Sequence, residues 1–288
     1  MRCKNGDWVV WTCKAGTTCS RADNGYLSCV PVGDDAGIIE DAGHDAGIHD
    51  AGIEDAGIED ASIVESDAGP IEDDGFISIP AGSFTLSHDT GSYSSGDTVT
   101  LAAFKLGKTP VTVVEFAKCV AAGECTSAHY ATDKDCNYVD DSKADHPMNC
   151  VDWYGAKEYC EWAGGRLPTE EEWEYASTHN GTEHLNTLYP WGDNSPTSST
   201  ANYNFNVDST TEVGRYSPAG DSPLGLVDMA GNVCEWTDSL YSSGSKSYIL
   251  KGGCWNSDEA KLRVTYRDYN FPTVKSYTSY GFRCAERK

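Results

Sequence analysis

The sequence lacks a basic surplus, a membrane-length apolar run and the signature motifs of several enzyme classes. Among 288 residues, 21 are Lys or Arg and 45 are Asp or Glu, which gives a formal charge of −24. Nucleic-acid binding requires a basic face, and a membrane-spanning helix requires about 20 consecutive apolar residues. No GxSxG, P-loop or HExxH motif occurs, which argues against the serine-hydrolase, nucleotide-binding and zinc-protease chemistry that those motifs carry. We therefore expect neither a nucleic-acid partner nor a transmembrane segment.

The acidity is concentrated in one segment. Residues 34–74 contain fifteen Asp or Glu and no Lys or Arg, so removing them changes the charge from −24 to −9. Because like charges repel and few apolar groups are available for burial, we predict that residues 33–74 form a disordered acidic linker of Asp-Ala-Gly repeats. Asp45, Asp50, Asp55 and Asp60 recur at intervals of five, so a calcium-binding repeat is the alternative. The longer Gly-Asp nonapeptide pattern of such repeats is absent.

Cysteine is abundant, and its spacing favours disulfides over a zinc site. The sequence contains no Cys-x-x-Cys pair and no Cys and His at ligand spacing. This usage suits an oxidising compartment, so we expect an extracellular or periplasmic protein. The sequence begins Met1-Arg2-Cys3 without the apolar stretch of a signal peptide, so we expect an export signal that this sequence does not include. A cytosolic protein would contradict the disulfide interpretation. The twelve cysteines are Cys3, Cys13, Cys19, Cys29, Cys119, Cys125, Cys136, Cys150, Cys160, Cys234, Cys254 and Cys284.

Residues 1–32 are predicted to be a small disulfide-rich module. A unit of this size cannot bury enough apolar surface to fold without cross-links. We expect its four cysteines to pair among themselves, and three connectivities are open. The segment has a weak resemblance to small chitin-binding modules, but we favour a disulfide-linked spacer or cap.

From residue 75 to residue 288 the chain is predicted to be globular. Residues 76–84 alternate between apolar and polar side chains, as a strand with a turn does. Capping boxes at Thr112–Glu115 and Thr169–Glu172 predict two helix starts, and Asp152 can cap a third helix between them. The acidic residues of the second box are explained by this helix start without catalytic acids. After Ser177 the chain is rich in Gly, Asn, Ser and Asp, so we expect long loops and short strands there.

A series of motifs in this region resembles the formylglycine-generating, or sulfatase-modifying-factor, family. The segments are FISIPAGSFTL, KTPVTVVEFAKC, HPMNCVDWYGAKEYCEWAGGRLPTEEEWEYA, YPWGD, LGLVDMAGNVCEWTDSLY, LKGGCW and GFRC, and they occur in the order of that family. The resemblance implies an α+β fold related to C-type lectins, with little regular secondary structure.

The resemblance also implies an activity whose key residues are absent from this sequence. Active members oxidise a cysteine of a client sulfatase to formylglycine with oxygen and a copper ion. Two cysteine thiolates, which suit copper(I), follow a Gly-Gly-Ser segment. The corresponding residues 252–263 contain neither family cysteine, and the loop is shorter. We therefore expect no copper and no catalytic residues.

The resulting hypothesis is an exported, monomeric binding or scaffold module for an unknown protein or carbohydrate ligand. The alternative is a formylglycine-generating oxidase, or a related oxidase with displaced ligands.

Cys234 and Cys254 replace an aromatic residue and the serine of the family pattern. If their strands lie side by side, the two can form a structural disulfide. The alternative is a rebuilt copper or redox pair. The resemblance pairs Cys160 with Cys284. The remaining predicted pairs are Cys119 with Cys125 and Cys136 with Cys150, which flank short loops.

The resemblance further implies calcium. One site would use the carboxylates of Asp228 and Glu235 with the carbonyl oxygens of Gly231 and Val233, all oxygen ligands that suit a hard cation. The alternative is a turn with solvated acids. A second site would use Asn202 and the Tyr203 carbonyl, but the following loop departs from the family pattern.

Overall fold

The computed structural model describes residues 17–21, 27–31, 75–275 and 277–287. The chain divides into two compact units, Met1–Asp67 and Ala68–Lys288. In the first unit, β1 (Thr17–Arg21) and β2 (Leu27–Pro31) form an antiparallel hairpin whose register sets Cys19 opposite Cys29. The predicted pairing that involves Cys3 and Cys13 and the predicted disorder of residues 33–74 lie outside the described residues.

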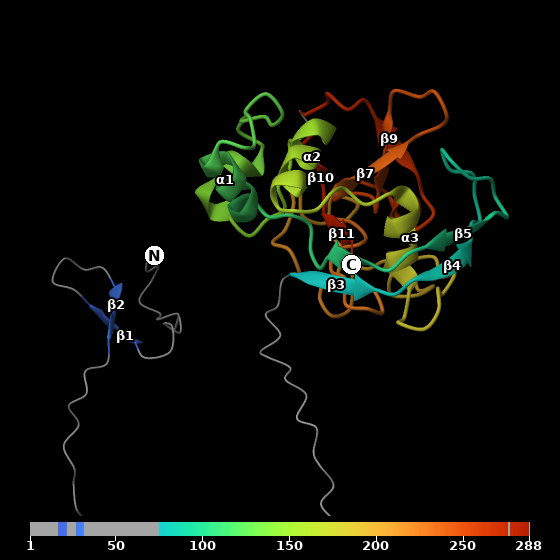
Figure 1. The fold of residues 1–288 in the computed structure, drawn as a ribbon, viewed down its shortest axis with the longest axis horizontal. Helices are drawn as coiled ribbons and strands as arrows, with labels where there is room; N and C mark the ends of the chain where they lie inside the picture. Colours follow the sequence, from blue (N-terminus) through green and yellow to red (C-terminus); the bar gives the residue numbers. More distant parts are fainter. Residues whose placement is uncertain (1–16, 22–26, 32–74, 276, 288) are drawn as a thin grey trace, which may run out of the picture. The chain divides into compact units, whose positions relative to one another are not determined.

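The second unit contains three small sheets (Figure 1). One has the strand order β11-β6-β3, the second is the β4-β5 hairpin, and the third has the order β10-β7-β8-β9. Only the β10–β7 pairing is parallel among these strands. The strands are β3 (Phe76–Ile79), β4 (Gly82–Thr85), β5 (Thr98–Leu101), β6 (Phe104–Gly107), β7 (Cys234–Leu240), β8 (Tyr248–Lys251), β9 (Asp268–Asn270), β10 (Tyr280–Gly281) and β11 (Ala285–Arg287).

Three α-helices begin at the predicted caps. They are α1 (Val113–Ala122), α2 (Trp153–Trp162) and α3 (Glu170–Thr178), with N-caps Thr112, Asp152 and Thr169. The capping boxes of α1 and α3 are complete, since each cap side chain and the Glu three residues later satisfy each other's backbone N–H. Three short 3₁₀ helices, η1 (Asn137–Val139), η2 (Asp141–Lys143) and η3 (Glu259–Leu262), complete the helical segments. None of the described helices is long and apolar enough to cross a membrane.

The prediction of long loops after α3 is confirmed. Between Thr178 and Cys234 the structure contains no helix or strand beyond isolated bridges. Side chains replace sheet hydrogen bonds in this segment. The buried amide of Asn232, for example, accepts a hydrogen bond from Thr211 N at 2.9 Å and donates one to Thr211 O at 3.2 Å.

Four disulfides cross-link this unit, and all four are predicted pairs. They are Cys119–Cys125, Cys136–Cys150, Cys160–Cys284 and Cys234–Cys254. The Cys160–Cys284 bond spans 124 residues and ties α2 to the residue before β11. A disulfide that closes a loop of this length lowers the chain entropy of the unfolded state, which stabilises the folded state by about 4–5 kcal/mol. The cross-links thus compensate for the small amount of regular structure.

The core is largely aromatic and contains more than one cluster of buried residues. Phe116 of α1, Trp236 of β7 and Phe282 belong to one cluster of buried residues, and Trp173 of α3 and Met229 belong to another. Each of these five side chains is fully buried. The largest aromatic side chains are therefore core residues, and the aromatic residues left at the surface are the ones to consider for binding.

Candidate ligand-binding site

The loop that follows β8 is cross-linked to the start of β7. Gly252 and Gly253 take positive φ angles of 87° and 66°, which glycine adopts without the steric cost of a side chain. They turn the chain so that Cys254 bonds to Cys234, with the two Cα atoms 4.7 Å apart. Within residues 75–287 every cysteine belongs to a disulfide, so the described domain contains no free thiolate at this loop. The predicted bond between Cys234 and Cys254 is therefore present, and its structural role stays a prediction.

A cleft of about 450 Å³ opens beside this loop. Trp255, the residue after the disulfide, is partly exposed in it. Its backbone N–H donates to Asn232 O at 3.0 Å and its indole Nε1 donates to Thr278 O at 3.4 Å, so both ends of the residue are held. The lining residues are Lys134, Asp135, Lys143, Asn149, Asp208, Ser209, Trp255 and Thr278.

The segment that packs against Trp255 has a strained backbone. Asn204 and Phe205 have φ angles of 47° and 58°, a left-handed conformation that costs non-glycine residues about 1–2 kcal/mol each. Backbone hydrogen bonds from Asn204 N to Ser257 O (2.8 Å) and from Phe205 N to Trp255 O (2.9 Å) hold this conformation. The Phe205 ring is 56% exposed and stands edge-on to Trp255, with 5.5 Å between centroids. Backbone strain that presents an exposed aromatic side chain is typical of binding sites.

The polar groups of the cleft are only partly satisfied within the protein. Lys143 Nζ donates to Asn137 Oδ1 at 3.0 Å and to Ser209 Oγ at 2.9 Å. The exposed side chains of Lys134, Asp135 and Asp208 have no hydrogen-bond or ion-pair partner among the described residues. Charged groups of both signs therefore remain available around an aromatic surface.

The structure brings the two predicted calcium segments together. A β-carbon on Gly231 would collide with the Asn202 carbonyl oxygen, and Asn232 N donates to that oxygen at 2.9 Å. Asp228 is 7% exposed, and its Oδ2 accepts from Gly214 N at 2.9 Å. Burial raises the pKa of the Asp228 carboxyl to about 6, because an ionised carboxylate loses hydration there.

The predicted ligand Glu235 has a different partner. Arg283 Nε donates to Glu235 Oε2 and Arg283 Nη2 donates to Oε1, each at 2.7 Å, and Trp173 Nε1 donates to Oε2 at 2.8 Å. Both charged residues are essentially fully buried. The arginine already neutralises the carboxylate, so a calcium ion at Glu235 would compete with Arg283. Calcium at Asp228, Gly231, Val233 and Glu235 stays a prediction.

Asn202, a ligand of the second predicted calcium site, has an unsatisfied hydrogen-bond acceptor. Asn202 is 1% exposed, its Nδ2 donates to Ser209 O at 2.9 Å, and its Oδ1 has no hydrogen-bond partner. An orphaned buried carbonyl oxygen is costly, and a hard cation is one group that would satisfy it. The Tyr203 carbonyl accepts from Asn206 N at 2.9 Å. Asn202 thus fits the predicted role, and the site remains untested.

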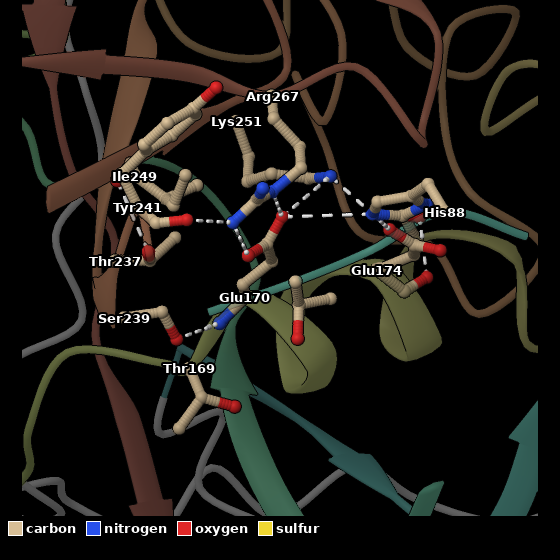
Figure 2. A network of polar contacts seen from close by, with 12 residues as sticks. His88, Thr169, Glu170, Glu174, Thr237, Ser239, Tyr241, Ile249, Lys251 and Arg267 are labelled. Carbon is tan, nitrogen blue, oxygen red and sulfur yellow. Dashed lines mark hydrogen bonds and ion pairs between the residues drawn. The ribbon is translucent and has the colours of Figure 1, made fainter. Parts of the chain in front are cut away.

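A buried charge cluster at the start of α3 was not predicted from the sequence (Figure 2). Glu170 and Lys251 are both 0% exposed, and Lys251 Nζ lies 3.2 Å from Glu174 Oε2 and 3.8 Å from Glu170 Oε1. Arg267 Nε donates to Glu170 Oε1 at 2.6 Å. The capping explanation of the acidic run therefore holds for Glu172 but is incomplete for Glu170.

The electrostatics of this cluster follow from its donors. Burial alone would raise the pKa of the Glu170 carboxyl, but His88, Lys251 and Arg267 together hold it below its ordinary value. His88 Nε2 is 3.7 Å from Glu170 Oε1, outside hydrogen-bonding distance, so the closer Arg267 contributes the stronger contact. Lys in the sequence Lys-Gly-Gly-Cys carries no local signal of burial, and only the packing of β8 against α3 reveals it.

These features define an α+β domain of short strands and long loops, braced by disulfides, with capped helices beside a distorted four-stranded sheet. Residues 62–288 match the Sulfatase-modifying factor enzyme 1-like domain, and the chain belongs to this family. The family and the fold inferred from the motifs are thereby confirmed.

Three relatives illustrate the range of proteins in which similar sequences occur. A serine/threonine-protein kinase pkn1 of Chlamydia caviae is 40% identical over 165 residues, which are 51% of this chain and 25% of that protein. A hercynine oxygenase of Mycobacterium tuberculosis is 30% identical over 215 residues, 60% of this chain and 50% of the relative. An inactive C-alpha-formylglycine-generating enzyme 2 of Bos taurus is 35% identical over 161 residues, 50% of this chain and 51% of the relative. The chain thus spans a quarter to a half of these relatives.

Solved structures show the same fold. PvdO from Pseudomonas aeruginosa superposes with a TM-score of 0.59 at 21% identity, covering 74% of this chain and 94% of that one. Treponema denticola variable protein 1 gives a TM-score of 0.54 at 22% identity, with 74% and 95% covered. At these identities the likeness concerns the fold alone.

Proposed function

We propose that this chain is an exported, non-catalytic binding module of the family, and that its ligand is a carbohydrate bound in the cleft beside Trp255. The observation that carries the first part is the Cys234–Cys254 disulfide. It lies in the loop where the family resemblance expects copper thiolates, and a sulfur in a disulfide is not a thiolate ligand. No group of three or more His, Cys, Asp or Glu in the described residues is arranged to hold a metal ion.

The relatives and the disulfides support this proposal. One relative is named as an inactive formylglycine-generating enzyme and another as an oxygenase, so related sequences occur in both kinds of protein. Four disulfides in one domain are consistent with an extracellular or periplasmic protein.

The carbohydrate assignment rests on the chemistry of the cleft. The partly exposed Trp255 offers a flat apolar surface, and the edge of Phe205 extends it. Around this surface Lys134, Asp135 and Asp208 supply unpartnered donors and acceptors. Sugars carry hydroxyls that both donate and accept, together with apolar C–H faces, and they match such a surface.

We also propose calcium as a structural ion at Asn202, whose buried Oδ1 lacks a partner. When bound, a calcium ion would supply positive charge to the unpartnered amide oxygen of Asn202. The side-chain amide of Asn202 already positions that loop through its hydrogen bond to Ser209 O.

The binding proposal is tested with a glycan array followed by titration of the best-bound sugar. Trp255→Ala is expected to weaken binding about tenfold or more, since loss of a stacked aromatic residue removes about 1.4 kcal/mol or more. Trp162→Ala is the matched control, because this tryptophan is 39% exposed on α2 and does not line the cleft. Equal effects of the two substitutions, or no glycan bound at all, would contradict the carbohydrate assignment.

The non-catalytic part has a separate test. The protein should not convert a Cys-x-Pro-x-Arg peptide to the aldehyde, with or without copper, as followed by mass spectrometry. Turnover that Cys254→Ser abolishes would instead support the oxidase alternative.

A further inference from the structure

A second cleft, of about 480 Å³, lies where α3 begins, and none of its lining residues lines the Trp255 cleft. Its walls are the loop around Tyr93, the end of β5, the first turn of α3 and the end of β7. A β-carbon at Gly91 would collide with the carbonyl oxygen of Leu240, so this glycine lets the loop pack directly on β7. The cleft is therefore formed by segments in close contact.

The decisive residue is Glu171, in the first turn of α3. It is only 7% exposed, and its carboxylate has no hydrogen-bond or ion-pair partner among the described residues. The carboxylate oxygens of Glu171 are not completely buried. Because Glu171 lines the cleft, the exposed part of its carboxylate faces the cleft. A buried carboxylate without a partner is unfavourable unless a donor approaches it.

The neighbouring acids leave the cleft negatively charged. Glu172 is neutralised, because Arg166 Nη1 and Nη2 donate to its two carboxylate oxygens, each at 2.6 Å. Asp238, across the cleft at the end of β7, has no ion-pair partner among the residues that the structure describes. Lys157 and Arg166 act on the Asp238 carboxylate at longer range, so Glu171 is the carboxylate that remains without a cation.

The shape and lining favour an organic cation over a metal ion. The described residues contain no group of three or more His, Cys, Asp or Glu placed to hold a metal ion, so Glu171 and Asp238 do not form such a site. Val99, Leu101 and Leu240 give the walls apolar surface. Tyr93, which is 40% exposed, places an aromatic ring at the rim, where it would favour a cation.

We propose that this cleft binds a lysine or arginine side chain of a peptide partner. The apolar walls would contact the aliphatic part of the side chain, and its charged end would donate to Glu171, with Asp238 adding a second negative charge. The site is independent of the Trp255 cleft and of the proposed carbohydrate ligand, so either proposal can fail alone.

The test uses the full chain and two peptides, Ac-Gly-Gly-Arg-Gly-Gly-amide and the same peptide with citrulline in place of arginine. Citrulline keeps the shape of the side chain and removes its charge. Isothermal titration at fixed ionic strength is expected to show binding of the arginine peptide only. Glu171→Gln should weaken that binding about ten- to hundredfold, the effect of losing a hydrogen bond to a charged group. Glu183→Gln is the matched control, since it removes the same charge at an exposed residue outside the cleft.

Several outcomes would overturn the proposal. The first is equal binding of the citrulline and arginine peptides, and the second is no binding of either peptide at millimolar concentration. The third is equal weakening of binding by Glu171→Gln and Glu183→Gln, which would indicate general attraction to an acidic protein. A fourth is tighter binding of free n-butylguanidine than of the peptide, which would assign the cleft to a small organic cation. Asp238→Asn, in a more exposed position, is a second variant in case Glu171→Gln does not fold. It should also weaken binding of the arginine peptide, by a smaller factor than Glu171→Gln.

Discussion

Replacing Arg283 with methionine should destabilise the domain more than any other single loss of a side-chain charge. Arg283 lies between Phe282 and Cys284, is 0% exposed, and uses all five of its N–H donors. Two reach the oxygens of Glu235 at 2.7 Å. The other three reach the carbonyl oxygens of Gly107 at 2.9 Å, Lys108 at 3.2 Å and Val227 at 2.8 Å.

The magnitude follows from what the substitution leaves behind. Methionine fills part of the volume but donates no hydrogen bond, so the Glu235 carboxylate remains buried with Trp173 Nε1 as its one remaining side-chain donor. Removing one partner of a buried ion pair costs about 3–5 kcal/mol. For a domain of this size each kcal/mol corresponds to about 2–4 °C in the melting temperature, so we expect a decrease of about 10 °C or more.

A double-mutant cycle measured by urea unfolding, with the disulfides intact, isolates the pair. Glu235→Leu alone leaves the guanidinium charge buried and should also be strongly destabilising. The combination of Arg283→Met and Glu235→Leu leaves no unpaired charge, so its loss should be smaller than the sum of the single losses by about 1–3 kcal/mol. Lys157→Met is the control, since its i,i+4 ion pair with Glu161 is exposed and should contribute about 0.5 kcal/mol or less.

The reasoning would be refuted by a loss under about 1 kcal/mol for Arg283→Met, or by additive single losses. Either result would mean that Glu235 is satisfied in another way in solution. A bound cation at the predicted calcium site is one such way, and the loss would then increase when a chelator is added.

Three further predictions concern the same domain. Because the pKa of Asp228 rises from 3.8 to about 6 on folding, ionisation of the unfolded chain should reduce stability as the pH rises from about 4 to 6. In the presence of chelator, Asp228→Asn should remove up to about 3 kcal/mol of this pH-dependent loss in the free energy of unfolding, measured with urea. A difference between variant and wild type that does not change with pH would contradict this. Replacing both Cys160 and Cys284 by alanine should cost about 2–5 kcal/mol, as calorimetry would show, and an unchanged melting temperature would mean that this bond does not form. Millimolar calcium should raise the melting temperature, and Asn202→Ala should abolish the shift, whereas indifference of the wild type to calcium and chelator would exclude the site.

The local features of this protein were determined by the sequence alone. Thr112 and Thr169 predict helix starts because a cap side chain and the Glu three residues later act within one turn, independently of the rest of the fold. The order of the motifs identified the family. The family resemblance implied the Cys160–Cys284 disulfide, and the positions of the other cysteines of residues 75–287 predicted the remaining three pairs. The scarcity of regular structure after Ser177 likewise follows from a composition rich in turn-forming residues.

Only the tertiary structure decided which charged groups are buried and what they contact. Glu235 is separated from Arg283 by 48 residues, and Glu174 from Lys251 by 77. No spacing along the chain indicates such pairs. The first forms where the segment before β11 lies against β7, and the second forms where β8 packs against α3. The same packing sets Phe205 against Trp255, leaves Asn202 Oδ1 without a partner, and directs Glu171 into a cleft. The residue type determines which interactions a side chain can make. The fold determines which of these groups have no partner within the protein and are therefore available to a ligand.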